Sequence, residues 1–469
     1  MPEVTPIIFQ DCSAGVITNV KSEIAPPNSV EMGINLIFDE IYGVAKVRKG
    51  STIIGSQING SNEVLGLFQY LNSAGTVSKL LSVVAGTIYS FNGSVWVTSS
   101  QTGTSNIKHR FLSFLDTVVR INGTDAAVAS SNGTTWGSSV ALDTANFPLG
   151  KFGTVYKDQV IIAGVNSDPD TLYISSVPSS GVISWLTNSR TITINPEDGQ
   201  NITALGEVNG TLIIWKDRSM YTWNNRSTEA DEIVRVGCSS QESVAACGNA
   251  LAFFNSKGVW LANGGYPILI SRPVQKWIDG MSSSYFNEVA AIGDEKYLYV
   301  SIGDCTVDSL AYSNIVLRYS VNTKEWAVFS YANKFKVFAE YLDTSYKIVG
   351  GDSISKVLTI ESSSLSDNGT DIKFDLQSQD QIFGSRGIVK EISERIMGYS
   401  KNAQGIVQVK IDDGDWKMIG TIQKEVENMQ IKESLKGNKM KFRVVGISKN
   451  RAEIKGLEIP NIMALGYSE

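Results

Sequence analysis

The side chains that most often carry catalysis are scarce in this sequence. His109 is the single histidine among 469 residues, and it lies in the phrase IKHRFLSF between basic and apolar positions. Ser-His-Asp and Cys-His mechanisms both need a histidine as the base, so either would have to use His109. We favour a packed or surface histidine. A glycosidase would need two opposed carboxylates, and no local motif nominates such a pair. We therefore predict that the protein is not an enzyme.

The cysteines do not have the spacing of a metal site. Structural zinc usually draws on closely spaced Cys and His, and no two cysteines here are arranged as C-x-x-C. Cys238 and Cys247 could pair across a hairpin, but free buried thiols are the interpretation that we favour, also for Cys12 and Cys305. We expect neither a metal nor a cofactor.

Two short acidic runs have the composition of a calcium loop without its pattern. Calcium needs several oxygens from one loop and often a distal bidentate glutamate. Residues 168–170 read Asp-Pro-Asp, and residues 412–415 read Asp-Asp-Gly-Asp but are followed by Trp416 and Lys417. Both are expected to be solvated turns. The glycine-rich phrases at 263–265 and 349–351 lack the spacing of a phosphate-binding loop.

The elements that would position these side chains are short strands. From Leu65 to Ser99 the chain reads LGLFQYL, a turn at SAG, SKLLSVVAG, TIYSFNG and SVWVTS. Runs of this length, rich in β-branched and aromatic residues and separated by Gly, Asn and Ser, are typical of a four-stranded antiparallel meander. One such sheet cannot bury its faces alone, whereas several arranged radially form a β-propeller.

Loosened copies of this phrase recur about every 45 residues, the spacing of four-stranded blades. We predict about six blades, with an error of about one. A short helix is expected on the rim, within 273–291. Aromatic residues such as Trp96, Trp136 and Trp215 are expected to pack between blades. The six phrases span residues 65–99, 108–139, 152–186, 202–236, 243–270 and 290–360.

Two further segments flank the predicted propeller, which we place at residues 61–365. Residues 1–60 form an N-terminal extension, expected to lie at the mouth of the first blade or to supply the strand that closes the ring. Residues 371–469 carry 16 Lys and Arg against 14 Asp and Glu, a richer charge content than the rest of the chain. Their alternating strands predict an antiparallel β-sandwich, joined through a polar linker at 362–370. The predicted fold is therefore all-β.

Overall composition restricts the partners. The net charge of −6 argues against a surface that grips nucleic acid, because neutralising phosphates needs clustered Lys and Arg. It is compatible with an acidic wall past which DNA slides. We see no apolar run long enough to span a membrane, and the first residues do not read as a secretory signal.

The phrase NLIFDEIYGVAKVRKGSTIIG, residues 35–55, resembles the N-terminal signature of β-propeller tail proteins of short-tailed bacteriophages. The residues that carry the likeness are Gly43, Arg48 and Gly50, in a strand, a turn and an R-x-G-like phrase before the first blade. The later phrases DQVIIAG, GTLIIWKDRSMYTW and KGVWLANGG are similar to the same group. It includes packaged-DNA stabilisation proteins and tail nozzle or hub proteins.

The resemblance implies a mechanical function in the virion tail, after assembly in the host cytoplasm. Subunits would form a homo-oligomeric ring, usually a hexamer, between the portal or adaptor proteins and the distal spike or fibre proteins. The lumen would retain packaged DNA and conduct it at infection without sequence-specific binding. The N-terminal turn, with Gly43, Arg48, Lys49 and Gly50, is a candidate partner contact. Arg48 and Lys49 would anchor the N-terminal strand, meet an acidic partner, or be solvated.

A carbohydrate-binding propeller with an accessory sandwich is the alternative. Nine Trp and 17 Tyr could line sugar-binding pockets.

Overall fold

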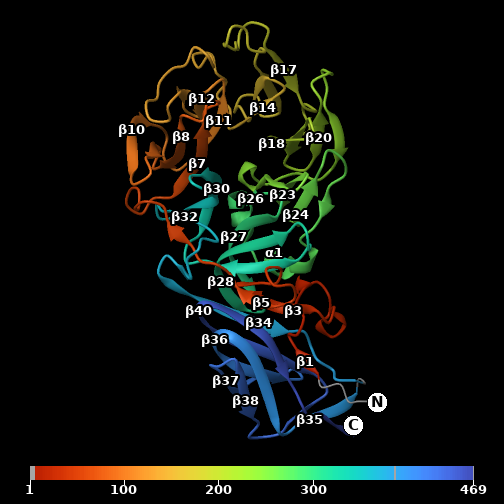
Figure 1. Cartoon of the computed structure of the whole chain (residues 1–469). Coiled ribbons are helices and arrows are strands. Elements are labelled where there is room, and N and C mark those ends of the chain that lie inside the picture. Colours follow the sequence, from red (N-terminus) through yellow and green to blue (C-terminus); the bar gives the residue numbers. More distant parts are fainter. Residues whose placement is uncertain (1–5, 385–386, 468–469) are drawn as a thin grey trace.

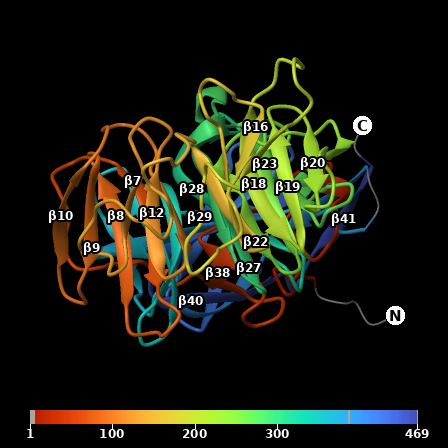
Figure 2. The same ribbon diagram turned by 90° about the horizontal axis from the view of Figure 1, so that it is seen from above.

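The computed structural model, which describes residues 6–384 and 387–467, is dominated by a ring of small antiparallel sheets (Figure 1). Each sheet is one blade of a β-propeller. The predicted fold class is confirmed, and seven blades are present within the described residues, where about six were expected. Figure 2 shows the first blade on one side of the ring and the fourth on the other.

The blades follow one another along the chain. The first blade comprises β7 (Val64–Leu71), β8 (Ser78–Val84), β9 (Thr87–Phe91) and β10 (Trp96–Thr102). The second comprises β11 (Arg110–Phe114), β12 (Thr117–Ile121) and β13 (Val128–Ser130). The third comprises β14 (Phe152–Tyr156), β15 (Gln159–Ala163), β16 (Thr171–Ile174) and β17 (Arg190–Thr193). The fourth and fifth comprise β18 (Ile202–Val208), β19 (Thr211–Lys216), β20 (Met220–Trp223) and β21 (Asp231–Val234); and β22 (Ala245–Cys247), β23 (Ala250–Asn255), β24 (Gly258–Ala262) and β25 (Ile268–Leu269). The last two comprise β26 (Ala290–Gly293), β27 (Tyr297–Val307), β28 (Leu310–Ser320) and β29 (Trp326–Ser330); and β30 (Phe335–Leu342), β31 (Tyr346–Asp352), β32 (Val357–Thr359) and β6 (Thr52–Ile53).

The ring is closed by a strand from the N-terminal segment. The innermost strands of neighbouring blades contact one another around most of the ring, β18 contacts β23 of the fifth blade, and β30 of the last blade lies beside β7 of the first. The outer strand of the seventh blade is β6, which pairs antiparallel with β32. Because the chain runs from β6 directly towards β7, the covalent backbone crosses the seam between the last blade and the first.

The seventh blade explains the difference in the blade count. Residues 290–360, taken above as one phrase, fold as two blades. Strands β27 and β28 are 11 residues long each and hide the usual spacing of turns. The following blade draws only three strands from this part of the chain, because its fourth is β6. A repeat period counted along the chain misses a blade whose strands come from two distant parts of the sequence.

The core lies between neighbouring blades, as expected for sheets that face one another. Trp215 of the fourth blade packs on Phe253 of the fifth, with ring centroids 5.3 Å apart. Tyr156 of the third blade packs on Trp223 of the fourth at 6.0 Å. These tryptophans are fully buried, which confirms that they pack between blades. Burial of such side chains is the main stabilising contribution of each interface between blades.

The sheet of the sixth blade continues outward into the C-terminal domain. Strand β29 pairs in parallel with β3 (Ser29–Ile34), and β3 pairs antiparallel with β34 (Thr370–Ser378). The order then runs through β40 (Met440–Glu458) and β36 (Arg395–Ile411) to β37 (Trp416–Ile422). In Figure 1 these strands extend from the ring to the lower end of the molecule.

A second sheet completes the predicted sandwich. It has the order β39 (Leu435–Gly437), β35 (Ile388–Ile392), β41 (Met463–Tyr467). Ile392 and Leu435 of this sheet belong to the same buried cluster as Phe442 and Val444 of β40. That cluster runs on without interruption into the sixth blade, so the two parts share one core.

The N-terminal segment is built into both the propeller and the C-terminal domain. Strand β1 pairs with β40, β2 with β3, and β5 with both β4 and β40. The shorter elements outside the blades are β1 (Ile7–Ile8), β2 (Gly15–Val16), η1 (Ser22–Ile24), β4 (Leu36–Ile37), β5 (Ala45–Val47), η2 (Gln241–Ser243), β33 (Ser366–Asp367) and β38 (Val426–Gln430).

The expected helical interruption lies between the fifth and sixth blades. It consists of η3 (Arg272–Val274), α1 (Gln275–Asp279) and η4 (Ser283–Glu288). Trp277 of α1 is fully buried and packs on Tyr312, with ring centroids 5.1 Å apart. Among the described residues, no helix has both the length and the apolar character needed to cross a bilayer.

Candidate functional site

The predicted N-terminal turn lies at the junction where three parts of the chain meet. Arg48 follows β5 and precedes the closing strand β6. Its side chain is fully buried. Both oxygens of Asp367 in β33 accept hydrogen bonds from it, at 2.9 and 2.6 Å. Arg48 therefore joins the N-terminal segment to the linker that leads into the C-terminal domain.

Every N–H group of this guanidinium has a partner. Beyond the two bonds to Asp367, Nε donates to Oδ1 of Asn35 at 2.8 Å, Nη1 to the carbonyl of Lys49 at 2.9 Å, and Nη2 to the carbonyl of Ser330 at 2.9 Å. Ser330 ends β29 of the sixth blade. A buried charge is tolerated when it is paired and its remaining donors are satisfied, and Arg48 meets both conditions.

An aromatic side chain covers the same guanidinium. The Cζ atom of Arg48 lies 3.8 Å from the ring centroid of Tyr331, a cation–π contact. Burial by itself would lower the pKa of Arg48, but Tyr331 and Asp367 outweigh it, and the pKa is raised. The charge of Arg48 is thus used inside the chain, as in the alternative that this residue anchors the N-terminal strand.

The neighbouring predicted residues have separate roles. Gly43 has φ of +78°, and a Cβ there would lie 2.7 Å from a carboxylate oxygen of Asp11. A Cβ on Gly50 would lie only 2.0 Å from the carbonyl oxygen of Ser366, because the two backbones lie side by side here and the neighbouring Ser51 forms a parallel bridge with Asp367. Lys49 is exposed. Of the four residues, it is the one whose side chain remains on the surface for a partner.

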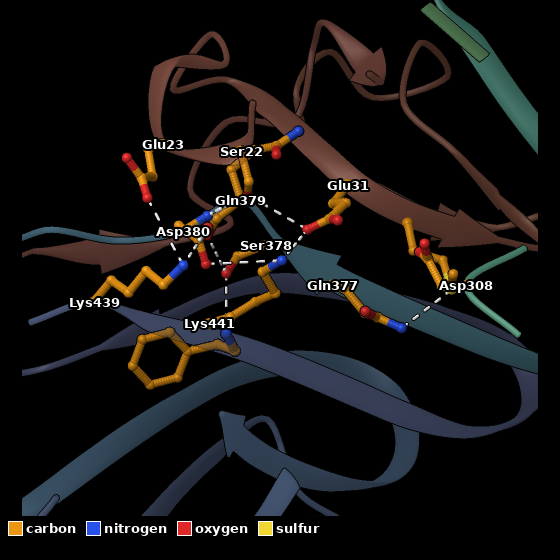
Figure 3. A network of polar contacts seen from close by, with 12 residues as sticks. Ser22, Glu23, Glu31, Asp308, Gln377, Ser378, Gln379, Asp380, Lys439 and Lys441 are labelled. Carbon is orange, nitrogen blue, oxygen red and sulfur yellow. Dashed lines mark hydrogen bonds and ion pairs between the residues drawn. The ribbon is translucent and has the colours of Figure 1, made fainter. Parts of the chain in front are cut away.

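An ion-pair network joins the C-terminal domain to the N-terminal segment and to the propeller (Figure 3). Lys441 of β40 pairs with Glu31 of β3, and Glu31 also pairs with Lys276 of α1 at 3.5 Å. Lys276 reaches Asp308, in the turn between β27 and β28, at 3.4 Å. Lys439 extends the network towards the N-terminal segment. Isolated surface pairs contribute little, but networks contribute more.

A second buried arginine lies at the same junction. Nη2 of Arg318 in β28 donates to both carboxylate oxygens of Asp39, at 2.9 Å each. Glu325 lies on the other side, 3.8 Å from Nη1, and neither of its oxygens has a hydrogen-bond partner. Burial first, and then repulsion from Asp39, raise the pKa of Glu325 to about 8. Two carboxylates therefore share one cation.

A different group of charges fills the centre of the propeller. Arg110, at the start of β11 in the second blade, pairs with Glu242, just ahead of β22 in the fifth blade, at 2.7 Å. These blades are three positions apart on the ring, so the pair spans its interior. Burial alone would raise the pKa of Glu242, but Arg110 and Lys108 hold it at about 2.

The other blades add to this axial group. Lys336 of the seventh blade pairs with Glu288, which precedes the sixth, at 2.7 Å, and with Glu63, which precedes the first, at 3.0 Å. Nζ of Lys108 donates to the carbonyl of Lys336 at 2.7 Å. Sequence reasoning missed all of these residues. The sequence did hold one signal for them, which is a charged residue at or next to the start of several predicted innermost strands.

The residues first considered for chemistry serve the fold. His109 is buried, and its Nε2 lies 2.9 Å from the carbonyl oxygen of Thr104; burial lowers its pKa. The four cysteines are free and buried. In the acidic turns, Asp168 accepts a hydrogen bond from Tyr173 and Asp412 accepts two from backbone amides. Across residues 6–384 and 387–467, no group of three or more acidic, His or Cys side chains is arranged to hold a metal.

No family model matches the chain, and no curated protein sequence matches it. Some solved structures are similar to parts of it. YCF48 from Cyanidioschyzon merolae is 9% identical, with a TM-score of 0.44 over 66% of this chain and 98% of its own. The extracellular domain of the putative one-component system BT4673 from B. thetaiotaomicron is 11% identical, with a TM-score of 0.43 over 91% and 62%. PorZ, a surface component of the type-IX secretion system of Porphyromonas gingivalis, is 12% identical, with a TM-score of 0.41 over 79% and 46%.

Proposed function

We propose that this protein is a structural subunit of the tail of a short-tailed bacteriophage. In this proposal, several copies form a ring that extends the portal channel, helps to retain packaged DNA and conducts it at infection. One observation carries the proposal. The phrase that resembles the phage family, residues 35–55, is also the segment that closes the propeller and joins it to the C-terminal domain.

Rigidity supports a mechanical role. The sixth blade and the C-terminal domain share one continuous sheet and one buried cluster. Arg48 and Arg318 add buried pairs at the junction, with Asp367 and Asp39 respectively. A ring that bears the pressure of packaged DNA needs subunits whose two ends do not move independently. The shared sheet would meet that need.

The proposed conduit lies between subunits and not through each propeller. The Arg110–Glu242 pair spans the interior of the ring of blades, and the pairs of Lys336 with Glu63 and Glu288 lie at the same end. These side chains leave no passage along the axis of a single propeller for a DNA duplex. The lumen would instead be bounded by the outer surfaces of neighbouring copies, with portal-side and spike-side partners at its two ends.

The alternative, a carbohydrate-binding propeller, has less support. Sugar sites commonly present aromatic faces, whereas Trp215, Trp223 and Trp326 are buried between strands and blades. The cavity near the propeller axis is lined mainly by charged and amide side chains, with Phe152 as its aromatic residue. That lining suits a polar or charged ligand better than the face of a sugar ring.

The proposal is tested with the phage that encodes this chain. Removing the gene should give particles that package DNA and then lose it, and a copy supplied in trans should restore retention. The variant Arg48→Met should fail to restore it, whereas Lys296→Met, which changes an exposed lysine outside the N-terminal turn, should assemble. Mass spectrometry of purified particles gives the direct readout. A chain that is absent from intact particles would rule the proposal out.

A further inference from the structure

A cavity of about 380 Å³ opens at the end of the propeller axis where the innermost strands begin. Its walls come from the starts of β11, β14 and β18 and from the residues just before β22 and β26. Five successive blades therefore contribute to one pocket. No single blade phrase contains it, so it is invisible in the sequence.

Cationic groups predominate on one side of this axial pocket. Lys108, Arg110 and Lys151 line it from the second and third blades, and the acidic residues that line it are Glu242 and Asp217. Asp217 is engaged at the rim, where it accepts a hydrogen bond from the amide of Asn201 at 2.7 Å. The three cations thus face two carboxylates, which leaves a net positive charge.

Arg110 is held in place by contacts that use two of its five N–H donors. Its Nη2 pairs with Glu242 at 2.7 Å, its Nη1 donates to the carbonyl of Lys151 at 3.0 Å, and its Cζ lies 4.9 Å from the ring centroid of Phe152. Its Nε is buried without a hydrogen-bond partner. The Arg110 side chain is 19% exposed, and the second N–H groups of Nη1 and Nη2 remain for an acceptor in the pocket.

Lys108 also has spare capacity to donate. An ammonium group has three donors, and the structure pairs one of them with the carbonyl of Lys336 at 2.7 Å. Burial is the main cause that lowers the pKa of Lys108; Arg110 and Lys336 lower it further, and Glu242 opposes them. A bound anion would offset the repulsion among these cations.

Neutral donors complete the lining. Ser239, Asn201 and Asn287 also line the pocket, and each carries a side chain that can donate a hydrogen bond. A planar or tetrahedral group of oxygens is the chemistry that accepts from several such donors at once.

We propose that the axial pocket is a binding site for a small oxyanion, the phosphate or carboxylate group of a small molecule, held by Lys108, Arg110 and Lys151. Glu242 orients Arg110, whose remaining Nη donors are left for the ligand. The site does not depend on the ring proposed above, because every residue in it comes from a single copy of the chain.

Isothermal titration of the full chain tests the site, with inorganic phosphate and glucuronate as separate probes and chloride at matched ionic strength as the blank. We expect saturable binding of at least one probe. Binding of phosphate alone would identify a phosphate ligand, and binding of glucuronate alone an acidic sugar or similar carboxylate. Lys108→Met should weaken binding by about tenfold or more, because a hydrogen bond to a charged group is lost.

Two further variants keep the test decisive. Lys151→Met changes an exposed residue of the wall, and it should weaken binding about threefold or more even if Lys108→Met fails to fold. Lys296→Met changes an exposed lysine outside the pocket and should leave the affinity unchanged. The proposal is overturned if the wild-type chain binds neither probe, or if Lys151→Met and Lys296→Met bind as tightly as the wild type.

Discussion

Arg110 in the second blade and Glu242 ahead of the fifth are joined by a 2.7 Å ion pair that spans the inside of the ring of blades. The residues are 132 positions apart in sequence and meet only when the intervening blades are in place. The pair can therefore form only when the second to fifth blades have assembled around the axis.

Breaking this axial pair should be costly when one partner is left behind. Arg110→Met leaves Glu242, whose pKa is held at about 2, without its main cation. We expect a loss of about 3–5 kcal/mol in the free energy of unfolding. The double variant Arg110→Met/Glu242→Gln should lose less than Arg110→Met alone. Denaturant titration of the single and double variants measures the coupling, and additive losses would contradict it.

Arg48 is expected to be the most sensitive single position at the junction. Arg48→Met leaves Asp367 buried without a cation and frees the carbonyl of Ser330, so it should cost about 3–5 kcal/mol of stability. The exposed neighbour Lys49 provides the matched control, and Lys49→Met should change stability by less than about 0.5 kcal/mol. Equal effects of the two substitutions in chemical denaturation would show that the buried pair does not hold the junction.

Glu325 should make the protein less stable as pH rises. Its pKa is raised from 4.5 to about 8 in the folded chain. The folded state therefore holds a proton that the unfolded state releases, and its contribution to stability is complete below about pH 4.5 and lost as pH rises towards about 8. Glu325→Gln, which stays neutral, should be more stable than the wild type by about 2–4 kcal/mol above that range.

The difference between the two proteins isolates this group from the other titrating residues. Denaturant midpoints of wild type and Glu325→Gln should converge near about pH 5 and separate near about pH 9. Curves that stay parallel across this range would contradict the assignment.

Gly50 is required by the close approach of two paired backbones. A Cβ at this position would lie 2.0 Å from the carbonyl oxygen of Ser366, so Gly50→Ala should force the closing segment and the linker apart. We expect a loss of about 1–3 kcal/mol, typical of overpacking. Gly265→Ala is the control, because the nearest atom to a Cβ there is at 3.7 Å. Thermal melts compare the two variants. A Gly50→Ala variant as stable as the wild type would contradict the close approach of the two backbones.

The all-β class and the propeller followed from the sequence, because each blade is a local meander whose strands and turns are adjacent in the chain. The seventh blade did not, because β6 reaches its partner β32 across some 300 residues. The axial pocket is likewise non-local, since its charged side chains come from the second, third, fourth and fifth blades. The motif pointed to Arg48, but its burial against Asp367 depends on contact between the N-terminal segment and the linker that precedes the C-terminal domain.

Cryo-electron microscopy of the purified protein, alone and with its portal-side partner, tests the central proposal most directly. The proposal predicts closed rings of about six subunits around an open channel, with each propeller visible beside the lumen and its own axis filled. Isolated two-part particles that remain single after the partner is added would contradict it.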